Sequence, residues 1–311
     1  MYEPPAELSD GAVLWALRTA WDEEISDVEH LALGFGAHHW RADIAQSPRF
    51  FVTYDRLNGR HTFDSLEQAY EGAAALAESG LEFVVAPART PEGPALLRLG
   101  SGALSCTPWL DGEVVGDGAI TEVATAEANL TDLARLHATR PPGLRRWRPL
   151  VNADFAEAVS ARLGRPWDTG PYGERAHRAL TESLAAIQEW TRQYLVRAEQ
   201  AGVRPWVATH GEPHTRNQVR TPDGIRFVDW ESLQLAPRER DLSSLVQAGY
   251  GRQAGADPAM VELFDVEWRL SEIDQYAHWF STPHTGTADD TIAFDGLIEE
   301  LNREPWWPRP D

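Results

Sequence analysis

The sequence contains no lysine, and all 28 basic residues of the 311-residue chain are arginine. This absence excludes enzymes that form a Schiff base on lysine, phosphate-binding loops of the G-x-x-x-x-G-K type, and mechanisms with a lysine acid or base. Arginine does not restore these chemistries, because its guanidinium is a planar fork whereas the ammonium of lysine is a compact point charge. The protein can therefore have only a function that does not depend on a lysine side chain.

Cysteine and long apolar runs are also scarce. Cys106 is the single cysteine, so the chain has no intrachain disulfide, and its apolar surroundings in "ALSCTPWL" predict a small buried side chain and not a nucleophile. The first residues lack the basic and apolar parts of an export signal, and no run of about 18 apolar residues occurs. We therefore expect a cytoplasmic protein with no membrane partner.

The formal net charge of −20 makes the chain strongly acidic. Such a charge repels phosphate backbones, so it argues against a nucleic-acid partner and favours a cationic small molecule. The chain is long enough for two domains or two lobes, and its hydrophobic content of 42% is ordinary for a globular protein. The sequence does not indicate an oligomeric state.

The pattern of apolar residues changes near residue 112, from strand-rich to mainly helical. Before this point a helix is expected at 9–20 and a second one at 65–80, with Ser65 as its N-cap and Gly80 as its C-terminal stop. Strands are expected within 28–57, 81–90 and 94–110. Beyond residue 112, helices are expected at 122–138, 153–163, 173–200, 241–248, 258–280 and 288–302. We therefore expect an N-terminal lobe of residues 1–112 and a C-terminal lobe of residues 113–311.

Two groups of polar residues in segment 207–232 indicate which class of reaction the protein could catalyse. The runs "WVAT" and "IRFV" are expected to form a pair of strands, with a tight turn at "TPDG" between them, so the polar residues lie at strand ends. Glu212 is a carboxylate that can orient a hydroxyl group. Asn217 and Asp229 supply oxygen ligands of the kind that Mg²⁺ prefers. This combination fits phosphoryl transfer.

The same segment resembles a known family. "HGEPHTRN" followed by "VDWE" is similar to the catalytic loop and metal-binding motif of the aminoglycoside phosphotransferase and choline kinase-like families. "LAPRERDLSSL" resembles the segment after their metal-binding aspartate, "LGFGAHHWRA" their nucleotide loop, and "TPWLDGE" their hinge between lobes. The match covers most of residues 28–250 and is closest to the actinobacterial branch that includes spectinomycin phosphotransferase. It implies a bilobal, protein-kinase-like α+β fold with a small β-rich N-terminal lobe and a larger helical one.

The resemblance also implies a function and a role for individual residues. The implied reaction moves the γ-phosphoryl group of ATP or GTP to a hydroxyl of a small, cationic molecule, an antibiotic or an aminated metabolite, with Mg²⁺ as cofactor. Glu212 would be the catalytic carboxylate, His210 would brace its loop and Asp241 would support that loop from beneath. The implied metal ligands are Asn217, Asp229 and Glu231. The implied nucleotide contacts are Gly34, Gly36, His38, Thr53, Trp109 and Leu110.

Two residues depart from the family pattern. Glu212 stands where the family has aspartate, and its extra methylene moves the carboxylate by about 1.5 Å, a displacement that costs on the order of 100-fold in rate unless the loop compensates. Thr53 stands where the family has a strand lysine that touches the nucleotide phosphates and pairs with a glutamate on the next helix, here Glu67 or Glu71. The candidates for the missing charge are Arg41, Arg49, Arg56, His38 and His39.

Other interpretations of these residues remain open. The polar residues of segment 207–232 could be ordinary capping and turn residues, and His210, Glu212 and His214 have the side-chain types, but not the spacing, of a zinc site. The chain could be a pseudokinase that binds a nucleotide or a partner without transferring phosphate. It could also modify a peptide or a natural-product intermediate on the same fold. Trp230, Trp268, Trp279, Asp274 and Glu272 are candidates for binding a cationic acceptor, and core packing is the alternative for each.

Overall fold

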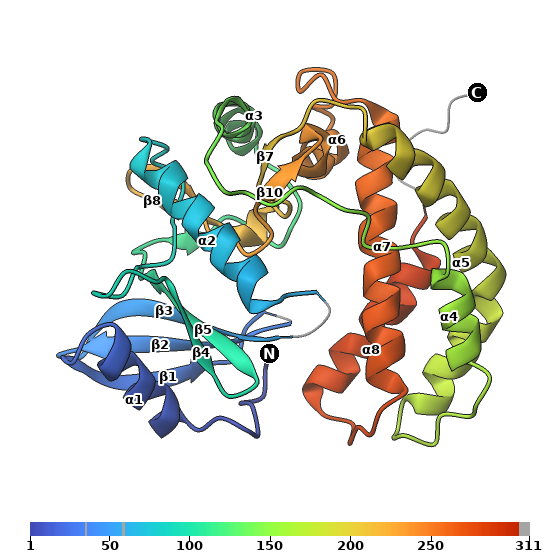
Figure 1. Ribbon diagram of the computed structural model, residues 1–311, viewed down its shortest axis with the longest axis horizontal. Helices are drawn as coiled ribbons and strands as arrows, with labels where there is room; N and C mark the ends of the chain where they lie inside the picture. The colour runs from blue at the N-terminus through green and yellow to red at the C-terminus, as the bar shows by residue number, and fades with distance from the viewer. Residues whose placement is uncertain (35, 58–59, 305–311) are drawn as a thin grey trace. The chain divides into compact units, whose positions relative to one another are not determined.

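The computed structural model describes residues 1–34, 36–57 and 60–304 (Figure 1). The chain divides into two compact units. The first comprises Met1–Trp147 and Trp206–Ala254, and the second comprises Arg148–Pro205 and Gly255–Asp311. The predicted lobe boundary near residue 112 stays a prediction. No helix of the described residues is long and apolar enough to cross a membrane.

A five-stranded antiparallel sheet forms the N-terminal part of the first unit, in the order β1-β2-β3-β5-β4. The strands are β1 (Ile25–Leu31), β2 (His38–Ile44), β3 (Ser47–Arg56), β4 (Leu96–Leu99) and β5 (Gly102–Pro108). Residues alternate between the two faces, as the two-residue period of a strand requires. On β3, Phe50, Val52 and Tyr54 are buried in a core shared with β1, β2, β5 and helix α1 (Asp10–Ala20). The intervening residues Thr53 and Asp55 therefore face the other side.

Helix α2 (Phe63–Glu78) follows β3 and packs Leu66 and Tyr70 against Leu96 and Ala103 of the sheet. The predicted N-cap at Ser65 was wrong by one turn. Thr62 is the cap, because its hydroxyl accepts from the Ser65 N–H while the Ser65 hydroxyl accepts from the Thr62 N–H. Gly80 has a φ of 91°, as expected of a glycine that ends a helix.

The described residues in the rest of the first unit form five short strands, and their pairing differs from the prediction. Strand β8 (Gln218–Thr221) pairs with β9 (Gly224–Phe227) across the predicted turn, whereas β7 (Val207–Thr209) pairs with β10 (Gln234–Ala236). Segment 81–90, expected to be a strand, forms only an isolated bridge from Val84 to Phe227. The remaining elements are β6 (Glu113–Val114), α3 (Val123–Ala138), η1 (Thr215–Asn217), η2 (Arg238–Asp241) and α6 (Ser243–Gln247).

The second unit is helical in the part that the structure describes. Its helices are α4 (Phe155–Arg162), α5 (Gly173–Ala201), α7 (Pro258–Phe280) and α8 (Ala288–Asn302). Helix α5 packs against α4, α7 and α8. The side chains of Ile187, Leu270 and Leu297 are fully buried between them. All four helices were predicted from the spacing of their apolar residues.

Candidate active site

Asn217 and Asp229 flank the β8–β9 pair, and Asn217 lies opposite Val228, the residue before Asp229. Gln218 pairs with Phe227, and the pairing continues one step further through a 3.0 Å hydrogen bond from the Val228 N–H to the Asn217 carbonyl. The Asn217 side-chain nitrogen donates to the Glu212 carbonyl at 3.0 Å. That bond uses the nitrogen of the amide and leaves its oxygen as the atom suited to a cation.

Asp229 has an unusual backbone conformation for a non-glycine residue, with a φ of 67°. Such a left-handed residue costs about 1–3 kcal/mol, and strain of this kind concentrates at functional sites. The side chain of Asp229 remains exposed to solvent. The surrounding protein raises its pKa, but the hydrogen bond from Glu231 and the nearby histidines outweigh this effect, so the pKa of Asp229 lies below its usual value.

Glu231 shares a proton with Asp229. Its side chain is buried, and burial together with the negative charge of Asp229 raises the pKa of Glu231 well above its ordinary value. Glu231 is therefore protonated and donates to Asp229. Its Oε2 atom is buried without a hydrogen-bond partner. Two carboxyl groups in contact, one with an unsatisfied oxygen, form an arrangement that a divalent cation would stabilise.

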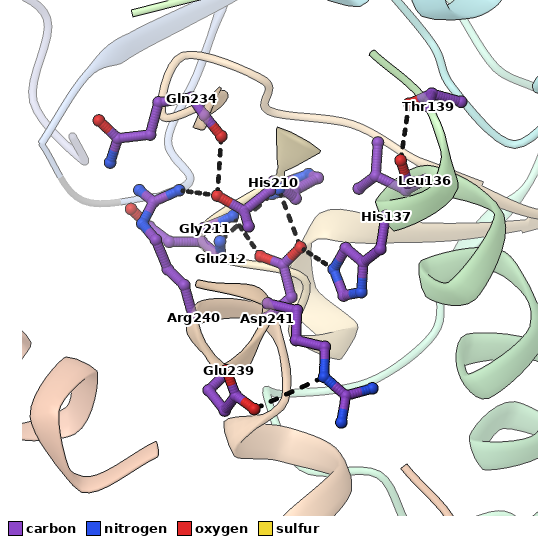
Figure 2. Close-up of polar contacts among 12 residues, drawn as sticks. Leu136, His137, Thr139, His210, Gly211, Glu212, Gln234, Glu239, Arg240 and Asp241 are labelled. Carbon is purple, nitrogen blue, oxygen red and sulfur yellow. Dashed lines mark hydrogen bonds and ion pairs between the residues drawn. The ribbon is translucent and has the colours of Figure 1, made fainter. Parts of the chain in front are cut away.

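The loop that carries Glu212 is held from below by Asp241, as Figure 2 shows. One carboxylate oxygen of Asp241 accepts from the Gly211 N–H at 2.7 Å, and the other accepts from the His210 N–H at 3.1 Å. His137 of α3 donates to the second oxygen from Nε2 at 2.9 Å. Burial raises the pKa of Asp241, but the hydrogen bond from His137 and the nearby positive charges lower it by more than that. The pKa of Asp241 therefore lies below its usual value, and Asp241 is an anion.

His210 braces the same loop with its ring. Nε2 donates to the Val228 carbonyl at 2.9 Å, and Nδ1 accepts from the Glu212 N–H at 3.3 Å. Burial lowers the pKa of His210, which keeps the ring neutral and able to do both. Because both ring nitrogens are used within the loop, His210 is not placed as a zinc ligand. No cluster of three metal-binding His, Cys, Asp or Glu side chains occurs among the residues of ranges 1–34, 36–57 and 60–304.

The carboxylate of Glu212 contacts an arginine from a distant part of the chain. Arg60, in the loop between β3 and α2, places Nη2 2.7 Å from Glu212 Oε1. The Ser232 hydroxyl donates to the same oxygen at 3.3 Å. The Glu212 side chain is 15% exposed and that of Arg60 is 27% exposed, so water reaches the pair only in part. Sequence reasoning did not find Arg60, since 152 positions separate the two residues.

Thr53, predicted to stand at the position of the family lysine, is paired with a histidine on the same face of the sheet. Thr53 pairs across the sheet with His39, and His39 Nδ1 lies 3.2 Å from the Thr53 hydroxyl. Burial lowers the pKa of His39 to about 4, so its ring is neutral at neutral pH. Gly34 lies directly beside the His39 ring, and both Gly34 and Gly36 have positive φ values, as turns of a glycine loop require.

His38 lies on the opposite face of β2 from Thr53. Its ring packs against Trp40 and Tyr54 in the core, and its Nδ1 is 3.1 Å from the Glu3 carbonyl. His39 is thus the histidine on the face of Thr53, although the sequence pattern indicated His38. Trp109 and Leu110, the predicted hinge residues, are half-buried after β5, where the Trp109 N–H donates to the Arg49 carbonyl at 3.1 Å.

Neither Glu67 nor Glu71 of helix α2 is buried against the sheet face that carries Thr53. Glu71 pairs with Arg89 through two 2.5 Å contacts, and Glu67 is exposed. Tyr70 is the buried residue that faces the strand, and its hydroxyl donates to Asp55 Oδ2 at 3.4 Å. Burial, followed by the charge of Asp229, raises the pKa of Asp55 to about 7.

The aromatic and acidic candidates for a cation site are used elsewhere. Trp230 is buried and donates to the Phe227 carbonyl, while Trp279 donates to Asp290. Asp274 pairs with Arg162, and Glu272 is buried and accepts from Gln275. Trp268 is 37% exposed. Core packing and internal pairing therefore account for most of this set.

Solved structures with the same fold are kinases that act on small molecules. Spectinomycin phosphotransferase, in complex with ADP and spectinomycin, matches with a TM-score of 0.72 at 16% identity, over 96% of each chain. Amicoumacin kinase, in complex with AMP-PNP, Ca²⁺ and its substrate, matches with a TM-score of 0.59 at 12% identity, over 97% of this chain and 96% of its own. These similarities confirm the predicted bilobal, kinase-like α+β fold.

Sequence comparison gives the family. Protein StrN of Streptomyces griseus is 29% identical over 305 residues, which cover 93% of this chain and 89% of StrN. The family model described as the phosphotransferase enzyme family matches residues 27–278. The chain therefore belongs to the phosphotransferase enzyme family, which confirms both the family predicted from the "HGEPHTRN" and "VDWE" motifs and the predicted class of enzyme, a small-molecule phosphotransferase.

Proposed function

We propose that this protein transfers the γ-phosphoryl group of ATP or GTP to a hydroxyl group of a small, cationic molecule. One observation supports the proposal: the β8–β9 pairing places Asn217 opposite Val228, the residue before Asp229, while Asn217 is also hydrogen-bonded to the backbone of Glu212. The oxygens suited to the metal and the carboxylate suited to the acceptor are thus joined in one structural unit.

In this proposal Glu212 orients the acceptor hydroxyl and takes its proton. The hydroxyl oxygen forms a bond to the γ-phosphorus, and the bond between that phosphorus and the oxygen of the leaving diphosphate breaks. His210 and Asp241 position the loop and do not touch the substrate, because their polar atoms bond to its backbone. Most of the rate enhancement in such a reaction comes from placement and charge neutralisation.

The residues present fit a magnesium ion. Asp229, Glu231 and the Asn217 side-chain oxygen would hold it, and the buried, unsatisfied Oε2 of Glu231 supports this assignment. Few protein ligands are needed, because Mg²⁺ keeps several waters and phosphate oxygens around itself. When bound, the ion supplies positive charge to the phosphates of the donor.

The nucleotide would lie against the face of the sheet that carries Thr53 and His39. We assign Gly34 and Gly36 to the loop over its phosphates, because backbone N–H groups can approach closely there. Trp109 and Leu110 would meet the base at the hinge. The solved structures of spectinomycin phosphotransferase and amicoumacin kinase are complexes with ADP and AMP-PNP, which supports nucleotide use in this fold.

The acceptor is expected to be a small polar molecule of the antibiotic type. Spectinomycin and amicoumacin are the small molecules named with the related structures. The cationic character rests on the net charge of −20, which attracts positively charged molecules over long distances.

Substitution of Asp229 tests the proposal. Asp229→Asn should abolish phosphoryl transfer, measured as ADP release and by ³¹P NMR of the product with a panel of aminated hydroxyl compounds. The matched control is Asp223→Asn, which removes the same charge from the exposed turn between β8 and β9. Full turnover by the Asp229→Asn variant would overturn the assignment of the metal site.

A nucleotide-binding protein without transfer activity is the second candidate. Thr53 in place of the strand lysine favours it, as does the ion pair that occupies Glu212. Calorimetry with AMP-PNP and Mg²⁺, followed by the transfer assay with ATP, separates the two candidates. Binding without product formation across the whole panel would favour the binding protein.

A further inference from the structure

The proposed nucleotide site has carboxyl groups in excess. Glu231 is hydrogen-bonded to Asp229, and the hydroxyl of the next residue, Ser232, donates to Glu212. Burial, followed by the negative charge of Asp229, raises the pKa of Asp55. A triphosphate adds further negative charge to this region. Two like charges about 4 Å apart repel by about 4 kcal/mol at an effective dielectric constant of 20, so a cationic side chain beside the phosphates would favour nucleotide binding.

Four of the five basic residues expected to supply the missing charge are paired with a carboxylate or neutral, and the fifth, Arg49, is exposed. Arg41 pairs with Asp43 and Glu29, and Arg56 pairs with Glu7. Arg49 is exposed and lies over the Phe50 ring. Burial lowers the pKa values of His38 and His39 to about 4, so neither carries a charge at neutral pH.

Arg60 contacts one of the carboxyl groups of the site, because its guanidinium bonds to Glu212 at 2.7 Å. Its charge also reaches Asp55, where it partly offsets the rise in pKa that burial causes. Arg60 therefore lies in the negative field where the phosphates of a donor nucleotide would bind.

We propose that Arg60 is the residue that binds the nucleotide phosphates in place of the strand lysine, and that it leaves Glu212 to do so. The proposal rests on the proposed function. A guanidinium forms two parallel hydrogen bonds to phosphate oxygens, and a triphosphate carries more charge than one carboxylate, so the exchange favours the phosphate. The same exchange releases the Glu212 carboxylate for the acceptor hydroxyl.

Nucleotide affinity measures the role of Arg60 without relying on turnover. Arg60→Gln should weaken the binding of AMP-PNP with Mg²⁺ by about 10- to 100-fold, the usual effect of losing a charge-assisted hydrogen bond. The affinity for adenosine, which has no phosphate, should not change. Arg60→Lys keeps the charge but not the fork, and should lie between the wild type and Arg60→Gln.

Arg56→Gln is the matched control. It removes one arginine from a contact with a single carboxylate, four positions earlier and at the exposed end of β3. AMP-PNP affinity should stay within about twofold of the wild type, because charge screening makes single exposed charges weak at physiological salt. Thermal unfolding of each variant checks that the protein is folded.

A double-mutant cycle tests the exchange of partners. Glu212→Gln frees Arg60 from its carboxylate and should tighten AMP-PNP binding up to about fivefold, as expected for a partly exposed ion pair. This gain should disappear when Arg60 is already glutamine. If the gain persists without Arg60, it comes from reduced repulsion between Glu212 and the phosphates, and the exchange is refuted.

The outcomes separate this proposal from the one on which it rests. If the wild type binds neither AMP-PNP nor GMP-PNP, the proposed phosphotransferase reaction and the role of Arg60 both fail. If the wild type binds AMP-PNP and Arg60→Gln binds it equally well, only the role of Arg60 fails. In that case a loss of turnover alone would mean that Arg60 merely positions Glu212.

Discussion

Asp241 offers a quantitative test of how the catalytic loop is built. Its two carboxylate oxygens accept three hydrogen bonds, from the N–H groups of His210 and Gly211 and from His137. Asp241 is 1% exposed and His210 is fully buried. The substitution Asp241→Asn preserves the size of the side chain and replaces one acceptor oxygen by an NH₂ group.

The loss of stability follows from the geometry of these bonds. If the Asn oxygen accepts from Gly211, the NH₂ group faces the His210 N–H, and two donors meet. A buried donor left unsatisfied costs about 1–3 kcal/mol, and a hydrogen bond that loses its charged partner weakens by about 1 kcal/mol. The His137 ring can change tautomer and accept, so its bond need not be lost. We therefore expect the free energy of unfolding to fall by about 2–4 kcal/mol.

Urea unfolding at pH 7.5, followed by tryptophan fluorescence, measures this difference. The control is Asp223→Asn, an exposed carboxylate in the same unit, which should stay within about 0.5 kcal/mol of the wild type. Phosphoryl transfer by Asp241→Asn should also fall, since the loop is no longer held. A stability within about 1 kcal/mol of the wild type would show that the loop does not depend on this carboxylate.

Three further substitutions test other contacts. Gly211→Ala should lower the free energy of unfolding by about 2–4 kcal/mol in urea unfolding, because residue 211 has a φ of 103° and an added Cβ would displace the Arg240 guanidinium from its bonds. The wild type should lose stability as pH falls from 6.5 to about 4, because burial keeps His38 neutral in the folded state while the unfolded state takes up the proton; His38→Gln should reduce the slope of stability against pH by up to about 1.4 kcal/mol per pH unit. Thr53→Lys in the Arg60→Gln background should restore AMP-PNP affinity, measured by calorimetry, if a cation on this face of β3 reaches the phosphates.

The parts of the site that are local in sequence were predictable. Glu212 and Asn217 are five positions apart, and Asp229 follows at the end of a short hairpin, so the motif itself fixes their spacing. The helices were equally predictable, since their apolar residues recur at the helical period over many turns. Helix α7, expected at 258–280, spans Pro258–Phe280.

Contacts between distant segments were not predictable. Strand β8 has a single apolar residue, Val219, so neither its presence nor its pairing with β9 is visible in the alternation of polarity. The choice between His38 and His39 depends on which face of β2 each residue occupies. That face is set by the pairing register, which shifts at two places along β2. Arg60 reaches Glu212 only because the fold brings its loop there.

The absence of a lysine at position 53 does not leave Glu67 or Glu71 of α2 buried without a partner. In a kinase that had lost only this lysine, the helix glutamate would remain buried without its partner, which costs about 3–5 kcal/mol. Here Glu71 is paired with Arg89 instead, and the position that faces the strand is filled by Tyr70, a neutral residue bonded to Asp55. If Thr53 stands at the position of the family lysine, both members of that pair are neutral here. The packing of α2 on the sheet then needs no cation at position 53, and under our proposal Arg60 supplies the positive charge that the phosphates need.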